Sequence, residues 1–195
     1  MNSKGFNRAM VACLWIVLAF MYIPIIAIIG MSFNATPYGM FPYVFTFDWY
    51  KILFTESNLL PACVFSLKFA FGVTVAAIII GTMASFGLQA YSPKWSNRLN
   101  ALIQLPIIIP WLVTAISLLL LFSFIGAGRS MVSMFFGNLI VVLPYVVLLV
   151  NGRFVSMDRT PESAARLLGA GPVRVFFDIT LPAIVPGIMA GGIMA

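Results

Sequence analysis

The sequence predicts an all-α integral membrane protein. Only 8% of its 195 residues are charged and 62% are hydrophobic, whereas soluble domains usually carry about 25% charged residues. Several uncharged or nearly uncharged stretches reach the roughly 20 residues that a membrane-spanning helix needs. None of these stretches shows the alternating polarity of a membrane β-barrel. The stretches cover residues 9–50, 69–91, 99–128 and 131–152.

About five membrane spans are expected, the first of them retained in the protein. Its apolar stretch is longer than the roughly 7–15 residues of a signal-peptide core, and no small-residue cleavage site follows. The last span, counted from Leu181, would reach only about 22 Å into a core about 30 Å thick. A truncated chain is therefore expected, in preference to a re-entrant helix. The expected spans are residues 9–31, 65–90, 101–125, 131–152 and 183–195.

Prolines and small residues inside these spans predict kinks and close helix packing. Proline lacks a backbone N–H and bends a helix, and small residues let two helix backbones approach closely. A role in substrate binding is the alternative for the glycines. The kinks are expected at Pro24, Pro106, Pro110 and Pro144, and the close packing at Gly72, Gly81, Ser85 and Gly87.

The basic residues predict an amino terminus on the cytoplasmic side of a plasma membrane. Loops rich in Lys and Arg stay in the cytoplasm, and the net charge of +6 fits this bias without any nucleic-acid partner. Lys68, near the start of the second span, is counted in neither set, because its side chain is expected to reach the outer interface. The cytoplasmic set is Lys4, Arg8, Lys94, Arg98, Arg153, Arg159, Arg166 and Arg174, and the outer set is Lys51 and Arg129.

The segment 32–64 is then expected outside the membrane, where its aromatic residues favour the interface. Asp48 is expected to cap a short helix over residues 49–54. An aromatic belt is the favoured interpretation, and a surface for an extracytoplasmic partner is the alternative. The chain is divided into an amino-terminal span with this segment, residues 1–58, and a transmembrane domain, residues 59–195.

The inventory of reactive side chains predicts neither an enzyme nor a metal site. The chain has no histidine, no carboxylate pair inside a span and no nucleophile beside a base. Cys13 and Cys63 are expected to be ordinary apolar side chains. Three polar residues inside the spans, Gln104, Asn138 and Asn151, are candidates for lining a translocation path, with hydrogen bonds between helices as the alternative.

The charged segment near the end of the chain predicts two short helices. Thr160 is expected to be the N-cap of the first, with Pro161 at its first position. Glu162 precedes Arg166 by four residues, which favours an ion pair. Gly169 stands where a left-handed residue ends a helix.

A tight corner, "GAGP", follows, and Pro172 is expected to begin the second helix. Val173, Phe176, Phe177 and Thr180 would form its apolar face, and Leu181-Pro182 would end it. The residues alone leave two interpretations open: a hairpin on the membrane surface without a partner, or a corner that docks into another protein.

The stretch "SAARLLGAGPVRVFFDITLP" (163–182) resembles the cytoplasmic signature of permease subunits of bacterial binding-protein-dependent ABC importers. That signature reads E-A-A, three residues, G, nine residues, I-x-L-P. Ser163 stands at the glutamate position, and Glu162 lies one residue earlier. The matching residues are Ala164, Ala165, Gly169, Ile179, Leu181 and Pro182.

Further stretches are similar to the spermidine/putrescine permeases of the second-subunit type. Permeases for iron, phosphonates, opines or amino acids share this style, so cargo other than polyamines stays open. The resemblance implies the type I ABC importer fold with six spans, of which the sixth would be missing here. A nonfunctional fragment is the remaining alternative. The similar stretches are residues 22–34, 47–54, 105–122 and 143–154.

The resemblance also implies partners and a role for the cytoplasmic loop 153–182. A second permease subunit, two cytoplasmic ATPase subunits and an extracytoplasmic substrate-binding protein would complete the importer, and ATP would bind to the ATPase, so no cofactor is expected in this chain. The glycine corner would dock into the ATPase. Outside the membrane only Asp48, Glu56 and aromatic residues would attract a polyamine. The implied docking residues are Glu162, Ser163, Ala164, Ala165, Gly169, Ala170 and Gly171, with Arg166 at the rim.

Overall fold

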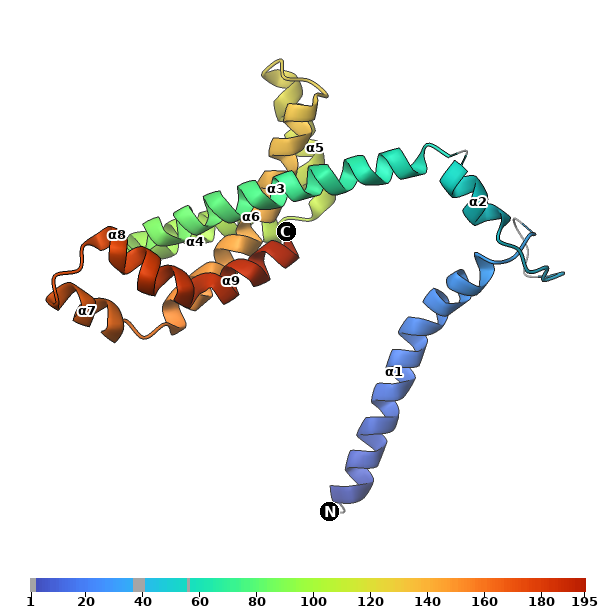
Figure 1. Ribbon diagram of the computed structural model, residues 1–195, viewed down its shortest axis with the longest axis horizontal. Coiled ribbons are helices and arrows are strands. Elements are labelled where there is room, and N and C mark those ends of the chain that lie inside the picture. Colours follow the sequence, from blue (N-terminus) through green and yellow to red (C-terminus); the bar gives the residue numbers. More distant parts are fainter. Residues whose placement is uncertain (1–2, 37–40, 56) are drawn as a thin grey trace. The chain divides into compact units, whose positions relative to one another are not determined.

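The computed structural model describes residues 3–36, 41–55 and 57–195 (Figure 1). Glu56 and the side chain of Lys4 lie outside the described part. The contacts divide the chain into two compact units, Met1–Phe65 and Ser66–Ala195. The domain boundary expected at residues 58/59 stays a prediction.

Within its described residues the first unit contains α1 (Ser3–Met31), α2 (Asp48–Thr55) and the start of a third helix from Leu59. The part of α1 from Met10 to Met31 is long and apolar enough to span a membrane, which confirms the expected first span. Pro24 lies inside α1 without ending it. The short helix α2 is also confirmed, but Asp48 is its first residue and pairs with Lys51 at 3.2 Å.

Aromatic side chains cover the end of α1 in this unit. The ring of Phe33 packs against Phe45 and Tyr50, with centroid distances of 5.6 and 5.2 Å. The indole Nε1 of Trp49 donates a hydrogen bond to the carbonyl of Asn34 at 2.9 Å. Asn34 is buried, and its side-chain oxygen accepts a hydrogen bond from the Val44 amide. Aromatic packing and hydrogen bonds therefore hold residues 33–34 against residues 44–50.

In the second unit the expected span over 101–125 is formed by two helices with a sharp bend between them, at the expected kink at Pro110. Two helices, α4 (Pro93–Ile108) and α5 (Trp111–Phe124), meet at an angle of 103°. Proline disfavours helical backbone at the residue before it, and Ile109, which precedes Pro110, is extended with φ −78° and ψ 132°. Pro110 therefore breaks the helix.

Two further helices follow the expected spans 65–90 and 131–152 closely. They are α3 (Leu59–Leu88), of which the second unit holds the part from Ser66, and α6 (Met131–Ser156). Pro106 and Pro144 lie inside α4 and α6 without ending them. Among the described residues four helices are long and apolar enough to span a membrane, or up to five spans if α4 and α5 count as one.

The last helix is continuous where the sequence predicted an end at Leu181-Pro182. The elements α8 (Pro172–Val175), η1 (Phe176–Thr180) and α9 (Leu181–Met194) follow one another without a break. η1 is a π-helical turn, in which the Leu181 amide donates to the Phe176 carbonyl. In an α-helix the ring of Pro182 would clash with the carbonyl four residues earlier. The wider π turn falls at this point and lets the helix continue.

This continuity joins the end of the signature segment to the expected last span. The stretch Pro172–Met194 has 23 residues and qualifies as a candidate span. At a rise of about 1.5 Å per residue it is about 34 Å long, which exceeds a core of about 30 Å.

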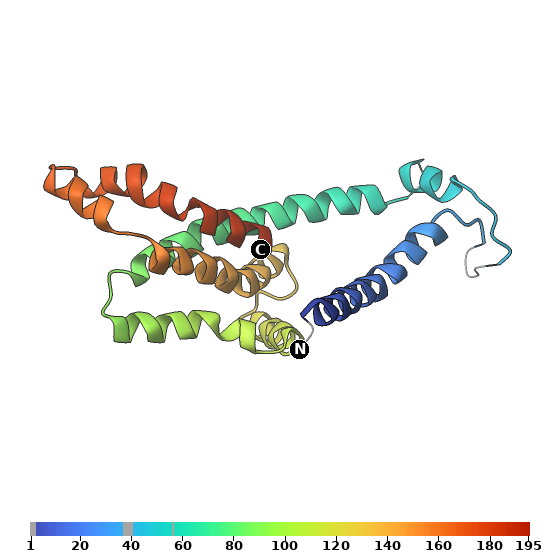
Figure 2. The same ribbon diagram turned by 90° about the horizontal axis from the view of Figure 1, so that it is seen from below.

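The core of the second unit lies where α3, α6 and α9 meet (Figure 2). Val146 of α6 is fully buried, and a Cβ added at Gly81 or Gly191 would lie within 3.0 Å of it. A Cβ at Gly187 would lie 2.9 Å from the Leu149 carbonyl oxygen. Glycines therefore let the three helix backbones approach one another closely.

Two of the four small residues predicted to pack tightly do so. Gly81 packs against Val146, and Ser85 is buried and donates to the Val147 carbonyl at 3.3 Å. The prediction was wrong for Gly87, since a Cβ there would meet no described atom within 4 Å. Gly72 has only an ordinary contact with Phe135, at 3.9 Å.

Gly187→Ala is predicted to destabilise the protein, because the new methyl group cannot fit unless the α6 backbone moves. Overpacking of this kind costs about 1–3 kcal/mol. The measurement is the free energy of unfolding of the purified protein in detergent, followed by tryptophan fluorescence. Gly87→Ala, in the open part of α3, is the matched control and should be neutral or slightly stabilising. Equal stability of the two variants would contradict the packing described here.

Candidate functional site

The signature segment begins with helix α7 (Thr160–Leu167), which is capped from outside. Thr160 was predicted to be the N-cap but is the first helical residue, with Pro161 second. The carboxylate of Asp158 takes the capping role, because its Oδ1 accepts hydrogen bonds from the amide and hydroxyl of Thr160 at 2.9 and 2.6 Å. These hydrogen bonds hold the pKa of Asp158 below its ordinary value.

The end of α7 at Gly169 is confirmed. Gly169 has a φ of +86°, which is the left-handed region. Its amide donates to the Arg166 carbonyl, and the Ala170 amide donates to the Ala165 carbonyl, both at 3.0 Å. This pair of hydrogen bonds is the Schellman motif. Pro172 then begins α8 as expected.

The hairpin of α7 and α8 stands at one end of the second unit (Figure 1), at the opposite end from the 125–130 loop. Leu167 and Leu168, at the end of α7, are 89% and 88% exposed. Neither leucine was among the docking residues that the resemblance implied. An apolar pair placed directly before the helix-ending glycine of a short charged helix was the signal that could have found them.

The expected face of the second helix was partly wrong. Thr180 is buried and Phe176 half-buried as predicted, but Val173 and Phe177 are 68% and 59% exposed, and Val175 is buried instead. Most residues between 172 and 180 are apolar, so the pattern alone did not distinguish between the two faces. Packing against α3 selects the face, with the rings of Phe86 and Phe176 in contact at 5.1 Å.

The Glu162 side chain points toward Thr180 rather than toward Arg166 in its own helix. Its carboxylate oxygen accepts a hydrogen bond from the Thr180 hydroxyl. The expected pair with Arg166 is wrong: both residues are described, and no ion pair between them occurs. Arg166 is exposed on the outer side of α7.

The structure thus sorts the predicted docking residues by exposure. The outer surface of the corner carries small side chains, one charge and the two leucines named above, whereas the inward residues connect the corner to the rest of the unit. The exposed ones are Ser163, Ala164, Arg166, Gly169, Gly171 and Pro182, and the half-buried ones are Glu162, Ala165, Ala170, Ile179 and Leu181.

A second hydrogen-bonded connection joins α7 to the rest of the unit. The Arg159 guanidinium donates to Gln89 Oε1 at 2.6 Å, and Gln89 Nε2 donates to Asn151 Oδ1 at 2.8 Å. Gln89 follows the end of α3, and Asn151 lies in α6. Asn151 therefore makes the hydrogen bond between separate elements that was the alternative to a role in a path.

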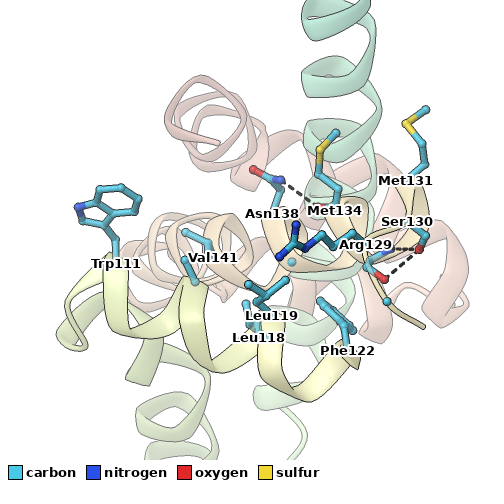
Figure 3. A pocket seen from close by; sticks show the side chains of 14 residues that line it. Trp111, Leu118, Leu119, Phe122, Arg129, Ser130, Met131, Met134, Asn138 and Val141 are labelled. Carbon is cyan, nitrogen blue, oxygen red and sulfur yellow. Dashed lines mark hydrogen bonds between the residues drawn. The ribbon is translucent and has the colours of Figure 1, made fainter. Parts of the chain in front are cut away.

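The three polar candidates for a path are not brought together. Gln104 donates to Asn100 Oδ1 at 2.9 Å, and Asn138 donates to the Met134 carbonyl at 2.9 Å, both within their own helices. Asn138 also lines an open cavity of about 660 Å³ between α5 and α6, with Trp111 and Phe122 (Figure 3). None of the described residues that line it is acidic, and Arg129 is basic.

Comparison with known proteins places these features in a family. Residues 77–195 match the model of the binding-protein-dependent transport system inner membrane component. The match includes α4 to α9, and so it contains the whole signature segment and most of the core.

Individual relatives are similar over most of the chain, including the first unit. The spermidine/putrescine transport system permease protein PotC of Haemophilus influenzae is 30% identical over 94% of this chain and 72% of its own length. The putrescine transport system permease protein PotI of Escherichia coli is 32% identical over 90% of this chain and 65% of its own length. The molybdenum transport system permease protein ModB of Mycobacterium bovis is 30% identical over 89% of this chain and 70% of its own length.

The chain thus spans about two thirds of the length of these relatives. The resemblance of the 163–182 stretch is confirmed, because a family model covers it and relatives match nearly the whole chain. The chain belongs to the family of binding-protein-dependent transport system inner membrane components.

Proposed function

We propose that this chain is a permease subunit of an ATP-driven importer in a bacterial plasma membrane, with polyamines as its cargo. The observation that carries the proposal is the family match over the part of the chain that holds both the core and the signature segment. The family is one of membrane transport rather than of enzymes. PotC and PotI, which match most of the chain, are named for spermidine and putrescine transport.

The outer surface of α7 and the glycine corner is proposed to dock into a cytoplasmic ATPase. Leu167 and Leu168 expose large apolar side chains at the end of a helix whose other residues are polar or small. Small residues at positions 163, 164 and 169–171 let a partner surface approach the backbone. Arg166 would lie at the rim of this contact. Burial of the leucines against the partner would add to the binding free energy, because it removes apolar surface from water.

The remaining partners are proposed from the same family. They are a second permease subunit, the ATPase pair that binds ATP, and an extracytoplasmic substrate-binding protein. Large apolar side chains stay exposed along the described spans of the second unit, among them Phe71, Ile79 and Met189. These surfaces need lipid or a second membrane subunit to cover them.

The proposed orientation puts the amino terminus and the signature segment in the cytoplasm. In the second unit the 91–100 and 153–174 stretches, which contain six basic residues, lie at one end (Figure 2). The Arg159–Gln89 hydrogen bond joins the second stretch to the residue that follows α3. Loops rich in Lys and Arg are retained on the cytoplasmic side.

The cargo is tested by transport with the complete importer. The chain is reconstituted in vesicles with the second permease subunit, ATPase and binding protein encoded beside its gene, and uptake of labelled spermidine, putrescine and molybdate is followed. ATP-dependent uptake of a polyamine supports the proposal. Similarity to ModB and the basic Arg129 in the cavity favour an anionic cargo as the second candidate. Uptake of molybdate alone would therefore overturn the polyamine assignment.

Leu168→Asp is predicted to weaken ATPase binding at least about tenfold, since it puts a charge into an apolar contact. The side chain is 88% exposed, so the variant should still fold and insert. Gly169→Arg should likewise abolish transport while insertion persists. The measurement is the amount of ATPase that copurifies with the tagged permease, together with uptake.

Val155→Asp is the matched control for Leu168→Asp. Val155 is 81% exposed in the last turn of α6 and lies outside the proposed contact. This variant should retain the ATPase. Normal copurification and uptake of Leu168→Asp, or equal losses in both variants, would refute the docking surface.

The orientation predicts that single cysteines on opposite loops will react from opposite sides. In a background with Cys13 and Cys63 replaced by alanine, Ala127→Cys should react with an impermeant maleimide in spheroplasts. Arg166→Cys should react only after permeabilisation. Both positions are exposed, so accessibility reports the side of the membrane. The reverse pattern would contradict the proposed topology.

A further inference from the structure

One hydrogen bond joins the outer hairpin to the base of the last helix. The Thr180 hydroxyl is buried, with the residue only 3% exposed, and donates to the half-buried carboxylate of Glu162. The carbonyl of Val175 is a longer second acceptor, at 3.4 Å. A buried hydroxyl bonded to a charged carboxylate is stronger than a neutral pair, so this bond fixes the direction of α7 relative to η1.

The position of Thr180 gives this bond a mechanical consequence. Thr180 is the last residue of the π turn, and the next residue begins α9. α9 is in turn seated on α6 through Gly187 and Gly191. A displacement of α7 is therefore passed to a helix that is packed into the core.

The hairpin is held at one end and free at the other. α7 has eight residues, and an isolated helix of this length is only marginally stable. Both side-chain connections lie at its start, from Arg159, the residue before the helix, to Gln89 and from Glu162 to Thr180. Its second half exposes Leu167 and Leu168. The held half faces this chain, and the free half faces any partner.

We propose that Glu162 is a positioning residue that couples α7 to α9 through Thr180, rather than a contact to the ATPase. This inference rests on the proposed function, since it assigns a role in transmitting ATPase movement to the spans. Ser163, which stands where the signature has glutamate, is exposed and lies on the partner side of α7. The carboxylate one residue earlier turns the other way and works inside the chain.

The test compares transport per ATP hydrolysed in vesicles that hold the complete importer. Thr180→Val keeps the size of the side chain and removes the hydroxyl, and it should lower this ratio about tenfold, the effect of losing one hydrogen bond to a charged group. Thr180→Ser keeps the hydroxyl and should stay within about twofold of the unmodified importer. ATPase copurification should persist in both variants, because neither touches the exposed leucines.

A double variant separates coupling from folding. Thr180→Val leaves the Glu162 carboxylate half-buried without its partner, so some loss could come from instability. Thr180→Val with Glu162→Met replaces both groups by apolar ones, which restores stability in such pairs. Hydrogen exchange of the α7 amides and the thermal midpoint should recover in the double variant, while transport per ATP stays low.

The possible results distinguish the positioning role of Glu162 from the proposed importer function. Recovery of transport per ATP in the double variant, or a normal ratio in Thr180→Val, would overturn the positioning role. Loss of ATPase copurification in Glu162→Gln would also overturn it, because that variant keeps an acceptor oxygen for Thr180 and changes only a direct contact. Failure of the unmodified importer to take up any cargo with ATP would refute the proposed function instead.

Discussion

The structure of the second unit depends on one continuous helix that begins outside the core and ends inside it. From Pro172 to Met194 the helix runs through the π turn without a break. Its inner part is fixed by close contact with α6, where Gly187 and Gly191 leave no room for a side chain and Ile184 is fully buried. Because this helix cannot slide on α6 without clashes, whatever is bonded to its outer end is positioned by the core.

The signature segment bonds to that fixed end through some of its side chains and exposes others. Three of its polar side chains bond within the chain, because Asp158 caps α7 and Arg159 and Glu162 bond to neighbouring elements. Its outer side keeps small residues and two leucines exposed. An arrangement with polar anchors inside and apolar side chains outside suits a part that must be rigid toward its own chain and adhesive toward another. The proposed function assigns the cytoplasmic ATPase to this outer side.

Local rules predicted much of this segment, and long-range packing decided the rest. The left-handed Gly169 and the start at Pro172 follow from residue chemistry that acts within a few positions, and both are confirmed. The inward turn of Glu162 was not predictable, because its partner Thr180 lies 18 residues away and across a π turn. The continuation through Pro182 was missed for a different reason, since the residue before a proline normally marks a helix end. The break at Pro110 was predicted only as a kink, and its size depends on tertiary packing.

The central claim, that α7 and the last span move as one body, can be measured directly. Spin labels at Arg166 of α7 and Met189 of α9, both exposed, report their separation in the complete importer, with Cys13 and Cys63 replaced by alanine. Distances are recorded without nucleotide and with ATP bound to a hydrolysis-deficient ATPase. The account predicts one narrow distance distribution that is the same in both states. A shifted distance or a second population with ATP would show that α7 moves independently of the span and would contradict it.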